Sequence, residues 1–372
     1  MKPLVIAEIG SSHRGDLIMA EELIAAAAEA GANCAKFQTI FADEIVPPNV
    51  GHVPLPGGSI PLYERFIELQ QPPTFYAELQ NLCERYGIAF LSSPFGIKSA
   101  RLLKQLGVKA IKIASPELNH LPLLQEVNSY GLPIMLSTGV SRLQDIENAL
   151  EVLSGLPEKA NTNSNSIFDN LPPISLLHCV TAYPAPEEDY NLKVIPLLSQ
   201  LFGVACGVSD HSLDPVLVPG LASAMGATII EKHITLSRQG DGLDDPVALE
   251  PKQFASMVKA IKTASAQSLE QTIKDYSREF GQSRVLAVLG SGQKTLAASE
   301  AENYGRTNRS LHALKDLPAG HMLAASDFAP LRTEKVLSCG ISPWYTDTII
   351  GKKLFKAITA GQGIRWEDLL HG

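Results

Sequence analysis

Two histidines, His211 and His233, lie at the ends of two apolar runs with strand character, VACGVSD and TIIEKHI. An Ala-rich segment of helical length, DPVLVPGLASAMG, joins the runs, and both strands of such a strand–helix–strand unit end at the same edge of a parallel sheet. Two imidazoles at neighbouring strand ends can bind one metal ion, although each could instead form only local hydrogen bonds. Three acidic residues lie close by in the sequence: Asp210, Glu231 and Asp244. The pattern therefore favours a functional site.

Two lysines lie inside apolar runs, Lys36 in CAKFQT and Lys112 in AIKIAS. A buried ammonium group is costly unless it is paired, so one interpretation is a structural ion pair of either lysine with Glu8 or Glu231. Serines stand at the ends of three neighbouring runs: Ser93, Ser115 and Ser137. Because ammonium groups neutralise an anion and hydroxyls bind it directionally, the set favours a site for a phosphate or carboxylate.

Eight apolar runs with strand character alternate with helical patterns over about 270 residues, which predicts a (β/α)₈ TIM barrel. The expected strands cover residues 4–10, 34–39, 88–95, 110–115, 133–139, 174–180, 204–210 and 228–234. An open doubly wound sheet is the alternative, but it would need a Gly-rich phosphate turn after the first strand, and IGSSHRGD lacks one. A barrel brings the polar strand ends together at one face, where a metal beside an anion site would suit activation of a carbonyl.

The segments outside the expected strands and helices define the domain organisation. Residues 40–72 are rich in Pro and Gly and predict a long functional loop, and the polar run EKANTNSNS at 158–166 predicts a surface insertion. We expect the barrel over residues 1–270, a polar linker over 271–307 and a small, mostly β module over 308–372. A module of this size makes few core contacts, so we expect it to dock on another surface.

Composition excludes several classes of function. The chain of 372 residues has a formal net charge of −8, which matches nucleic acid and anionic membranes poorly. We find no signal peptide and no apolar run long enough to span a bilayer. The five cysteines are scattered without CxxC spacing, as is typical of reduced thiols. We therefore expect a cytoplasmic protein with small-molecule substrates.

An ordered set of motifs resembles the N-acetylneuraminate (sialic acid) synthase family: AEIGSSHRGD, AKFQT, SSPF, KIASPELNHLPLL, LSTG, LLHCVTAYPAPEEDYNL, GVSDHSLD and IIEKHIT. The C-terminal module resembles that family's SAF, or antifreeze-like, domain. The resemblance implies a synthase that condenses phosphoenolpyruvate with N-acetylmannosamine or a related sugar aldehyde, with the help of Mn²⁺ or Mg²⁺. C3 of phosphoenolpyruvate would attack the aldehyde, water would add to C2, and phosphate would leave, giving a 2-keto-3-deoxy acid.

The same resemblance implies roles for individual residues. The metal ligands would be His211 and His233. The residues around phosphoenolpyruvate would be Lys36, Ser93, Lys112, Ser115 and Ser137, with Thr181 in place of an asparagine in the phosphate site. The sugar would face Gln38, Glu117, Tyr183 and Asp244. Glu8 or Glu231 would deprotonate the water. Arg332 would enter the barrel of the partner subunit in a domain-swapped homodimer.

Three segments depart from the family pattern: residues 12–15 replace N-H-x-G, residues 241–245 replace P-G-P-D-H, and residues 332–335 replace R-P-G-x-G. These departures lie on the sugar side, so the acceptor sugar stays open. Two other functions also remain. One is a Schiff-base aldolase with Lys112 or Lys36 as the nucleophile. The other is a non-catalytic, sugar-binding homologue that uses the SAF-like module as a recognition surface.

Overall fold

The computed structural model describes residues 2–55, 58–155, 166–334 and 336–369, and its centre is an eight-stranded parallel sheet. The strands follow the order β5-β2-β1-β10-β9-β8-β7-β6, and the two ends of this order, β5 and β6, also lie against each other. Their bounds are β1 Leu4–Gly10, β2 Cys34–Thr39, β5 Ala89–Pro94, β6 Ile111–Ile113, β7 Ile134–Ser137, β8 Ile174–Cys179, β9 Ala205–Asp210 and β10 Ile229–His233. The predicted (β/α)₈ barrel is confirmed.

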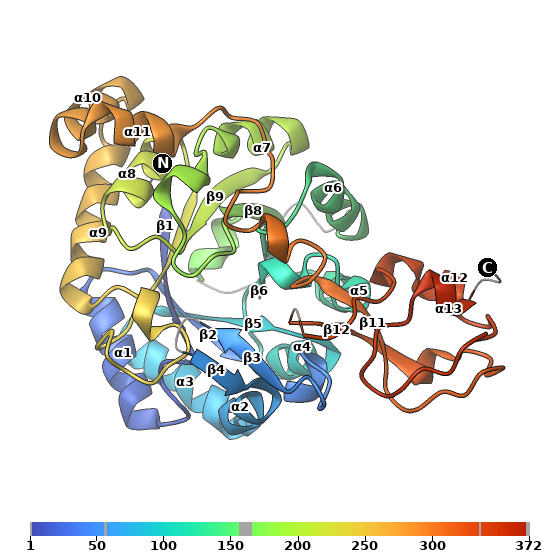
Figure 1. Cartoon of the computed structure of the whole chain (residues 1–372). Helices are drawn as coiled ribbons and strands as arrows, with labels where there is room; N and C mark the ends of the chain where they lie inside the picture. Colours follow the sequence, from blue (N-terminus) through green and yellow to red (C-terminus); the bar gives the residue numbers. More distant parts are fainter. Residues whose placement is uncertain (1, 56–57, 156–165, 335, 370–372) are drawn as a thin grey trace.

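A ring of helices covers the outside of the strands (Figure 1). It consists of α1 Leu17–Glu29, α3 Pro73–Arg85, α4 Ile97–Gln105, α5 Leu121–Asn128, α6 Leu143–Val152, α7 Val194–Phe202, α8 Leu217–Ala224 and α9 Pro251–Ser265. In α1 the Asp16 carboxylate caps the N-terminus by accepting the backbone N–H groups of Ile18 and Met19. The buried residues of α1 recur at helical spacing: Ala20, Leu23, Ile24 and Ala27. None of the described helices is long and apolar enough to cross a membrane.

The period of two along each strand builds the barrel interior in layers. A lower apolar layer contains Ile6, Cys34, Leu91, Ala110, Met135, Leu177 and Ile229, and Phe168 joins it. Two residues further along the chain, the same face carries the polar layer of Glu8, Lys36, Ser93, Lys112, Ser137, Cys179 and Glu231. The layer nearer the C-terminal ends of the strands is therefore charged and polar, above an apolar floor.

The segment over residues 40–72 is more ordered than the predicted loop. It contains an antiparallel hairpin, β3 His52–Leu55 and β4 Gly58–Pro61, followed by helix α2 Leu62–Leu69. The buried side chains of α2, at positions 62, 66 and 69, have helical spacing and pack into an apolar cluster with Phe95. The density of Pro and Gly around α2 obscures this spacing in the sequence, so the prediction of a long loop is wrong here.

The segment over residues 271–307, for which the sequence predicts a polar linker, contains most of helix α10 Leu269–Phe280 and all of α11 Gln282–Leu289. Val285, Val288 and Leu289 of α11 are buried in the main barrel core, and Tyr276 of α10 joins them. The segment reads as polar because its helices bury only one narrow face. It is therefore packed on the barrel rather than extended as a free linker.

The C-terminal module contains the antiparallel pair β11 Arg309–Ala313 and β12 Phe328–Arg332 and two short helices, α12 Thr346–Ile349 and α13 Trp366–Leu369. Its core is separate from that of the barrel and includes Leu311, Leu317, Phe328, Leu354 and Ile364. The module lies at one side of the barrel (Figure 1). This confirms the small, mostly β domain, whereas the predicted insertion at 158–166 lies, except for Ser166, outside the described residues.

Candidate active site at the barrel mouth

A buried ion network joins four of the predicted residues. Lys36 Nζ lies 3.1 Å from Glu8 Oε2 and 3.0 Å from Glu231 Oε2, and Lys112 Nζ lies 3.4 Å from Glu231 Oε1. The Ser209 hydroxyl donates to Glu231 Oε1 at 2.8 Å. Each of the four charged residues is at most 4% exposed. The two lysines are thus ion-paired within the barrel, and the same pairing places them together at its mouth.

The two lysines differ in how completely they are paired. Burial lowers the pKa of Lys36, but Glu231 and Glu8 outweigh it and hold that pKa above its ordinary value. Burial also lowers the pKa of Lys112, and there the attraction of Glu231 does not compensate. The Glu231 pKa is raised by burial but held below its ordinary value by Lys112 and Lys36 together. Lys112 therefore has the larger unmet demand for a negative charge.

Three buried hydroxyls lie at or just beyond the C-terminal ends of β5, β7 and β8. The side-chain oxygens of Ser93, Ser137 and Thr181 have no hydrogen-bond partner among the described residues. The Ser115 hydroxyl accepts the Gly139 N–H at 3.0 Å, and a Cβ at Gly139 would strike the Thr181 hydroxyl. Buried polar groups normally have partners, so donors of this kind beside a lysine fit an anionic ligand. The anion site predicted from the sequence thus has a matching group of side chains.

The two predicted metal ligands also lie together. The rings of His211 and His233 are 5.6 Å apart between centroids, and His233 Nδ1 lies 3.8 Å from Asp244 Oδ2. His211 Nδ1 lies 2.8 Å from the Val180 carbonyl oxygen, which can only accept, so Nδ1 carries a proton, and in the neutral ring Nε2 keeps its lone pair. Burial lowers the pKa of His211, but Cys179 and the Val180 carbonyl outweigh it and hold that pKa above its ordinary value. Burial lowers the pKa of His233 to about 4, which leaves a neutral ring at pH 7.

The fit of this pair to a metal ion is partial. In the part of the chain that the structure describes, no group of three or more His, Cys, Asp or Glu side chains is spaced to hold a metal. A neutral His233 ring and a His211 ring whose Nδ1 is fixed as a donor match a site whose other ligands are water or substrate oxygens. The donor set therefore fits a bound divalent cation of that open kind.

The residues predicted to face the sugar occupy two places. Gln38 Nε2 donates to Glu8 Oε1 at 3.1 Å, and Gln38, Glu8 and Asp244 all surround Gly10, where a Cβ would lie 3.2–3.3 Å from each. The Tyr183 ring stacks on His211 with centroids 4.2 Å apart. Burial raises the pKa of Asp244 to about 6. These side chains lie beside the histidines at the mouth.

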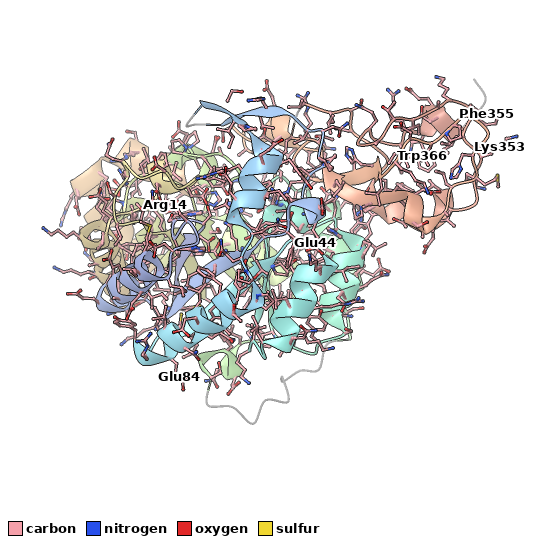
Figure 2. All side chains as sticks on the ribbon, turned by 90° about the horizontal axis from the view of Figure 1, so that it is seen from below. Arg14, Glu44, Glu84, Lys353, Phe355 and Trp366 are labelled. Carbon is pink, nitrogen blue, oxygen red and sulfur yellow. The ribbon has the colours of Figure 1, made fainter. Side chains whose placement is uncertain are left out.

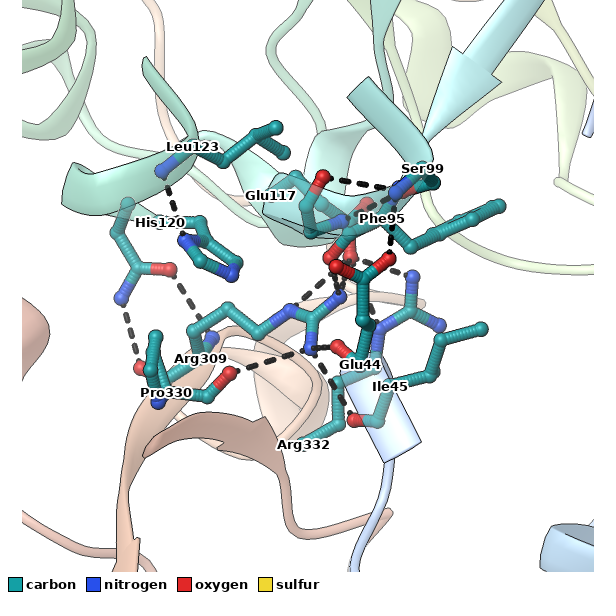
Figure 3. Close-up of polar contacts among 12 residues, drawn as sticks. Glu44, Ile45, Phe95, Ser99, Glu117, His120, Leu123, Arg309, Pro330 and Arg332 are labelled. Carbon is teal, nitrogen blue, oxygen red and sulfur yellow. Dashed lines mark hydrogen bonds and ion pairs between the residues drawn. The ribbon is translucent and has the colours of Figure 1, made fainter. Parts of the chain in front are cut away.

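Glu117 and Arg332 lie where the barrel meets the C-terminal module (Figure 3). Glu117 Oε1 receives Arg332 Nη2 and Arg309 Nη2, each at 2.7 Å. Arg309 is 2% exposed and also donates to the carbonyl oxygens of Ile45 and Phe95. In this single chain Arg332 thus contacts its own barrel. Glu117 Oε2 has no hydrogen-bond partner among the described residues, so one oxygen remains for a ligand.

Sequence reasoning missed Cys179, Gly139 and Arg309. Cys179 lies two residues after Leu177 of the apolar layer, with Sγ 3.9 Å from His211 Nδ1, so strand alternation was the signal that could have found it. Gly139 could have been found only from the close approach of Thr181. Arg309 stands in the apolar run RSLHA without any local sign of its distant partner Glu117.

Two of the segments that depart from the family pattern contact each other. The Ser12 hydroxyl donates to Asp245 Oδ1 at 2.6 Å, and Arg14 pairs with Asp241 at 3.1 Å. Asp245 Oδ2 also accepts the Gly242 N–H at 2.8 Å, which fixes the turn before Asp244. These two departures therefore form one connected unit beside the predicted sugar side.

Comparison with known proteins shows which family the chain belongs to. The NeuB family model matches residues 23–274, and the SAF domain model matches residues 308–370. The chain is 33% identical to an N,N'-diacetyllegionaminic acid synthase of Legionella pneumophila, over 99% of this chain and 95% of that protein. It is 30% identical to a pseudaminic acid synthase of Helicobacter pylori, over 99% and 98% respectively. The crystal structure of the Bacillus subtilis spore coat polysaccharide biosynthesis protein SpsE is 30% identical, with a TM-score of 0.80 and coverage of 100% of this chain and 96% of that one. With its barrel, its C-terminal module and these matches, the chain belongs to the NeuB family.

Proposed function

We propose that the protein is a phosphoenolpyruvate-dependent nonulosonic acid synthase, which joins phosphoenolpyruvate to an amino-sugar aldehyde. The observation that carries the proposal is the group of buried hydroxyls without partners beside the incompletely paired Lys112. Two relatives are named as synthases of N,N'-diacetyllegionaminic acid and of pseudaminic acid, and these names support a nonulosonic acid as the product. The products of such a reaction are a nine-carbon 2-keto-3-deoxy acid and phosphate.

The anion would lie between Lys36, Lys112 and the serine and threonine hydroxyls. Lys112 supplies the charge that is least neutralised by the protein, and Ser93, Ser137 and Thr181 supply directed hydrogen bonds. Binding at several points would hold C3 of phosphoenolpyruvate in position for attack, which lowers the entropic part of the barrier. The apolar layer beneath would exclude water from this end of the substrate.

The acceptor would lie beside the histidines. A divalent cation, Mn²⁺ or Mg²⁺, would be held by His211 and His233 and would, when bound, polarise the acceptor's carbonyl oxygen. Gln38, Asp244 and Tyr183 surround this place and would position the sugar. Glu117 Oε2 and Arg332 would contact the sugar at the side of the C-terminal module.

Glu8 is the stronger candidate for the base that activates water. Glu231 is held by Lys36, Lys112 and Ser209, and its lowered pKa makes it a weak base. Glu8 contacts Lys36 and Gln38 and pairs in register with His233. A carbon–carbon bond would form between C3 and the aldehyde carbon, the new alkoxide would take a proton, water would add to C2, and the C2–O bond to phosphate would break.

We also propose that the protein acts as a homodimer. The C-terminal module exposes Tyr345, Trp366 and Ile350 by 48%, 42% and 38%, and the two aromatic rings pack at 5.3 Å. Figure 2 shows Trp366 and Phe355 on the part of the module away from the barrel. Such a face would suit a second copy of the chain. In a domain-swapped pair, the contact of Arg332 with Glu117 would form between subunits.

The test is a panel of amino-sugar aldoses incubated with phosphoenolpyruvate and Mn²⁺. Phosphate release and a product mass equal to acceptor plus phosphoenolpyruvate plus water minus phosphate are expected for at least one aldose. The His211→Ala, His233→Ala double variant should release no phosphate above background. Phosphoenolpyruvate binding that is equal in wild type and in Lys112→Met would count against the proposal.

A Schiff-base aldolase is the second candidate, because a lysine with a lowered pKa such as Lys112 can form an imine. It predicts a covalent adduct on Lys112 after borohydride treatment with substrate, and activity that resists chelators. For a synthase, we expect that no adduct forms and that chelators abolish the activity.

A further inference from the structure

The segment over residues 290–308, which joins the barrel to the C-terminal module, contacts the anion site from behind. Glu300 in this segment is 1% exposed, and its Oε2 accepts the N–H groups of Thr181 at 2.8 Å and Val140 at 3.0 Å. Its Oε1 accepts the Ala297 N–H at 3.3 Å. One carboxylate oxygen thus holds the loops that follow β7 and β8 together.

Other side chains of the same segment bind the carbonyl groups of these loops. Lys294 Nζ donates to the Thr138 carbonyl at 3.1 Å, Asn303 to that of Thr181 at 3.2 Å, and Asn308 to that of Val140 at 3.2 Å. The backbone groups of the two loops are therefore satisfied by residues more than 100 positions away in the sequence.

These contacts matter because the loop after β7 is strained. Val140 has a φ of +42°, and a β-branched residue rarely adopts this left-handed conformation unless its surroundings impose it. Directly before Val140, the Gly139 N–H donates to the Ser115 hydroxyl. Because Gly139 has no side chain, the Thr181 hydroxyl fits beside it. The strained turn therefore adjoins the anion site. Glu300 accepts one hydrogen bond from Val140 in the turn and one from Thr181 in the anion site.

We propose that Glu300 is a positioning residue for the anion site, because it fixes the loops that carry Gly139 and Thr181. The inference rests on the proposed function and adds that the segment between the two domains is part of the phosphoenolpyruvate site. Loss of the Glu300 acceptor frees the N–H groups of Thr181 and Val140 and lets the turn relax out of its strained conformation. The hydroxyl of Thr181 then no longer lies at the anion.

The test measures phosphoenolpyruvate binding by calorimetry in wild type and in Glu300→Ala, Glu300→Gln and Glu300→Asp. Glutamine keeps an oxygen with two lone pairs that can accept both N–H groups, whereas aspartate keeps the charge but is one methylene too short. We expect binding to weaken by about tenfold or more in the Ala and Asp variants and by less than about threefold in the Gln variant. The KM for phosphoenolpyruvate should rise in parallel, while the KM for the aldose should stay within about twofold, since a site that is merely less stable loses kcat and keeps its KM.

Asp189→Ala is the matched control, because the Asp189 side chain accepts the neighbouring Ser299 N–H at 3.0 Å, whereas the N–H groups of Thr181 and Val140 donate to Glu300. It should bind phosphoenolpyruvate like wild type. Equal weakening in Asp189→Ala and Glu300→Ala, or wild-type binding in Glu300→Asp, would overturn the inference. If Glu300→Ala does not fold, the Gln and Asp pair decides alone. Absence of phosphoenolpyruvate binding in wild type would overturn the proposed function and this inference together, and is thus distinguishable from a negative result in the variants.

Discussion

The two lysines at the barrel mouth, Lys36 and Lys112, have different roles although both are buried in the same polar layer of the barrel. Lys36 is held by Glu8 and Glu231 at 3.1 and 3.0 Å, so it neutralises two carboxylates at once. Lys112 has a single ion-pair partner among the described residues, at 3.4 Å. At the scale of the residue, Lys36 thus mainly stabilises the folded site through its two ion pairs. Lys112 is the lysine whose charge an incoming anion would neutralise.

Substitution of each lysine by methionine should separate these roles. Lys36→Met leaves two buried carboxylates without their shared partner, so the free energy of unfolding should fall by about 3–5 kcal/mol. Lys112→Met leaves Glu231 paired with Lys36, so stability should stay within about 1 kcal/mol of wild type, while phosphoenolpyruvate binding weakens by about tenfold to a hundredfold. Urea unfolding and calorimetry measure the two effects, with the exposed Lys109→Met as the control. Wild-type affinity in Lys112→Met would contradict this assignment.

Most residues of the candidate site could be predicted because they interrupt apolar strands. Lys36 and Lys112 are conspicuous in this way, and the two histidines stand at matching strand ends. Glu300 and Arg309 could not be predicted, because their partners lie more than 100 residues away and no local pattern records such a contact. The pairing of the lysines depends on the barrel register, which the sequence alone does not determine.

At the scale of elements, strand alternation explains the site better than any single motif. Most strands present an apolar residue to the floor and, two positions later, a polar residue to the mouth, as Ile6 and Glu8 do on β1. Helix α2 and the hairpin before it were not predicted, because turn-forming residues dominate residues 40–72. The strands could be predicted since their apolar runs are continuous.

Asp327 illustrates how one carboxylate organises the start of β12. It accepts from His321 Nε2 at 2.7 Å and from the Ala324 N–H at 2.8 Å, and it pairs with Lys315 at 2.9 Å. These partners, the His321 hydrogen bond first, hold the Asp327 pKa below its ordinary value of 3.8. The charged form is therefore favoured by folding, so its stabilisation is complete above about pH 4 and is lost as the pH falls through the folded pKa.

Asp327→Asn should destabilise the C-terminal module by about 1–3 kcal/mol at pH 7, and this difference from wild type should shrink as the pH is lowered below about 4. Both tryptophans, Trp344 and Trp366, lie in the module, so fluorescence-detected unfolding reports on it. The exposed Asp347→Asn should show no comparable dependence on pH. A difference that stays constant from pH 7 to pH 3 would be inconsistent with the proposed pairing.

At the scale of the whole molecule, the barrel and the C-terminal module are joined by a buried cluster in which one carboxylate faces two guanidinium groups. Glu117 receives Arg309 and Arg332, residues that are 192 and 215 positions distant. The sequence predicts the two domains from their different patterns, but it does not predict this contact. The cluster links the position of the module directly to a strand end of the barrel.

Glu117→Gln should loosen the module, because two buried guanidinium groups lose their shared negative charge. The free energy of module unfolding should fall by about 3–5 kcal/mol, and hydrogen exchange should increase in β11 and in residues 41–46. Glu126→Gln removes the partner of the exposed Arg101 and should cost at most about 1 kcal/mol. Unchanged hydrogen exchange in Glu117→Gln would show that the cluster does not hold the module.

The central claim, condensation of phosphoenolpyruvate with an aldose, is tested most directly by ³¹P NMR with phosphoenolpyruvate that carries ¹⁸O at the oxygen bridging C2 and phosphorus. Addition of water to C2 followed by cleavage of the C2–O bond sends the label into phosphate. We expect labelled phosphate that forms only when an acceptor aldose and a divalent cation are both present. Unlabelled phosphate, or labelled phosphate formed at the same rate without an aldose, would contradict it.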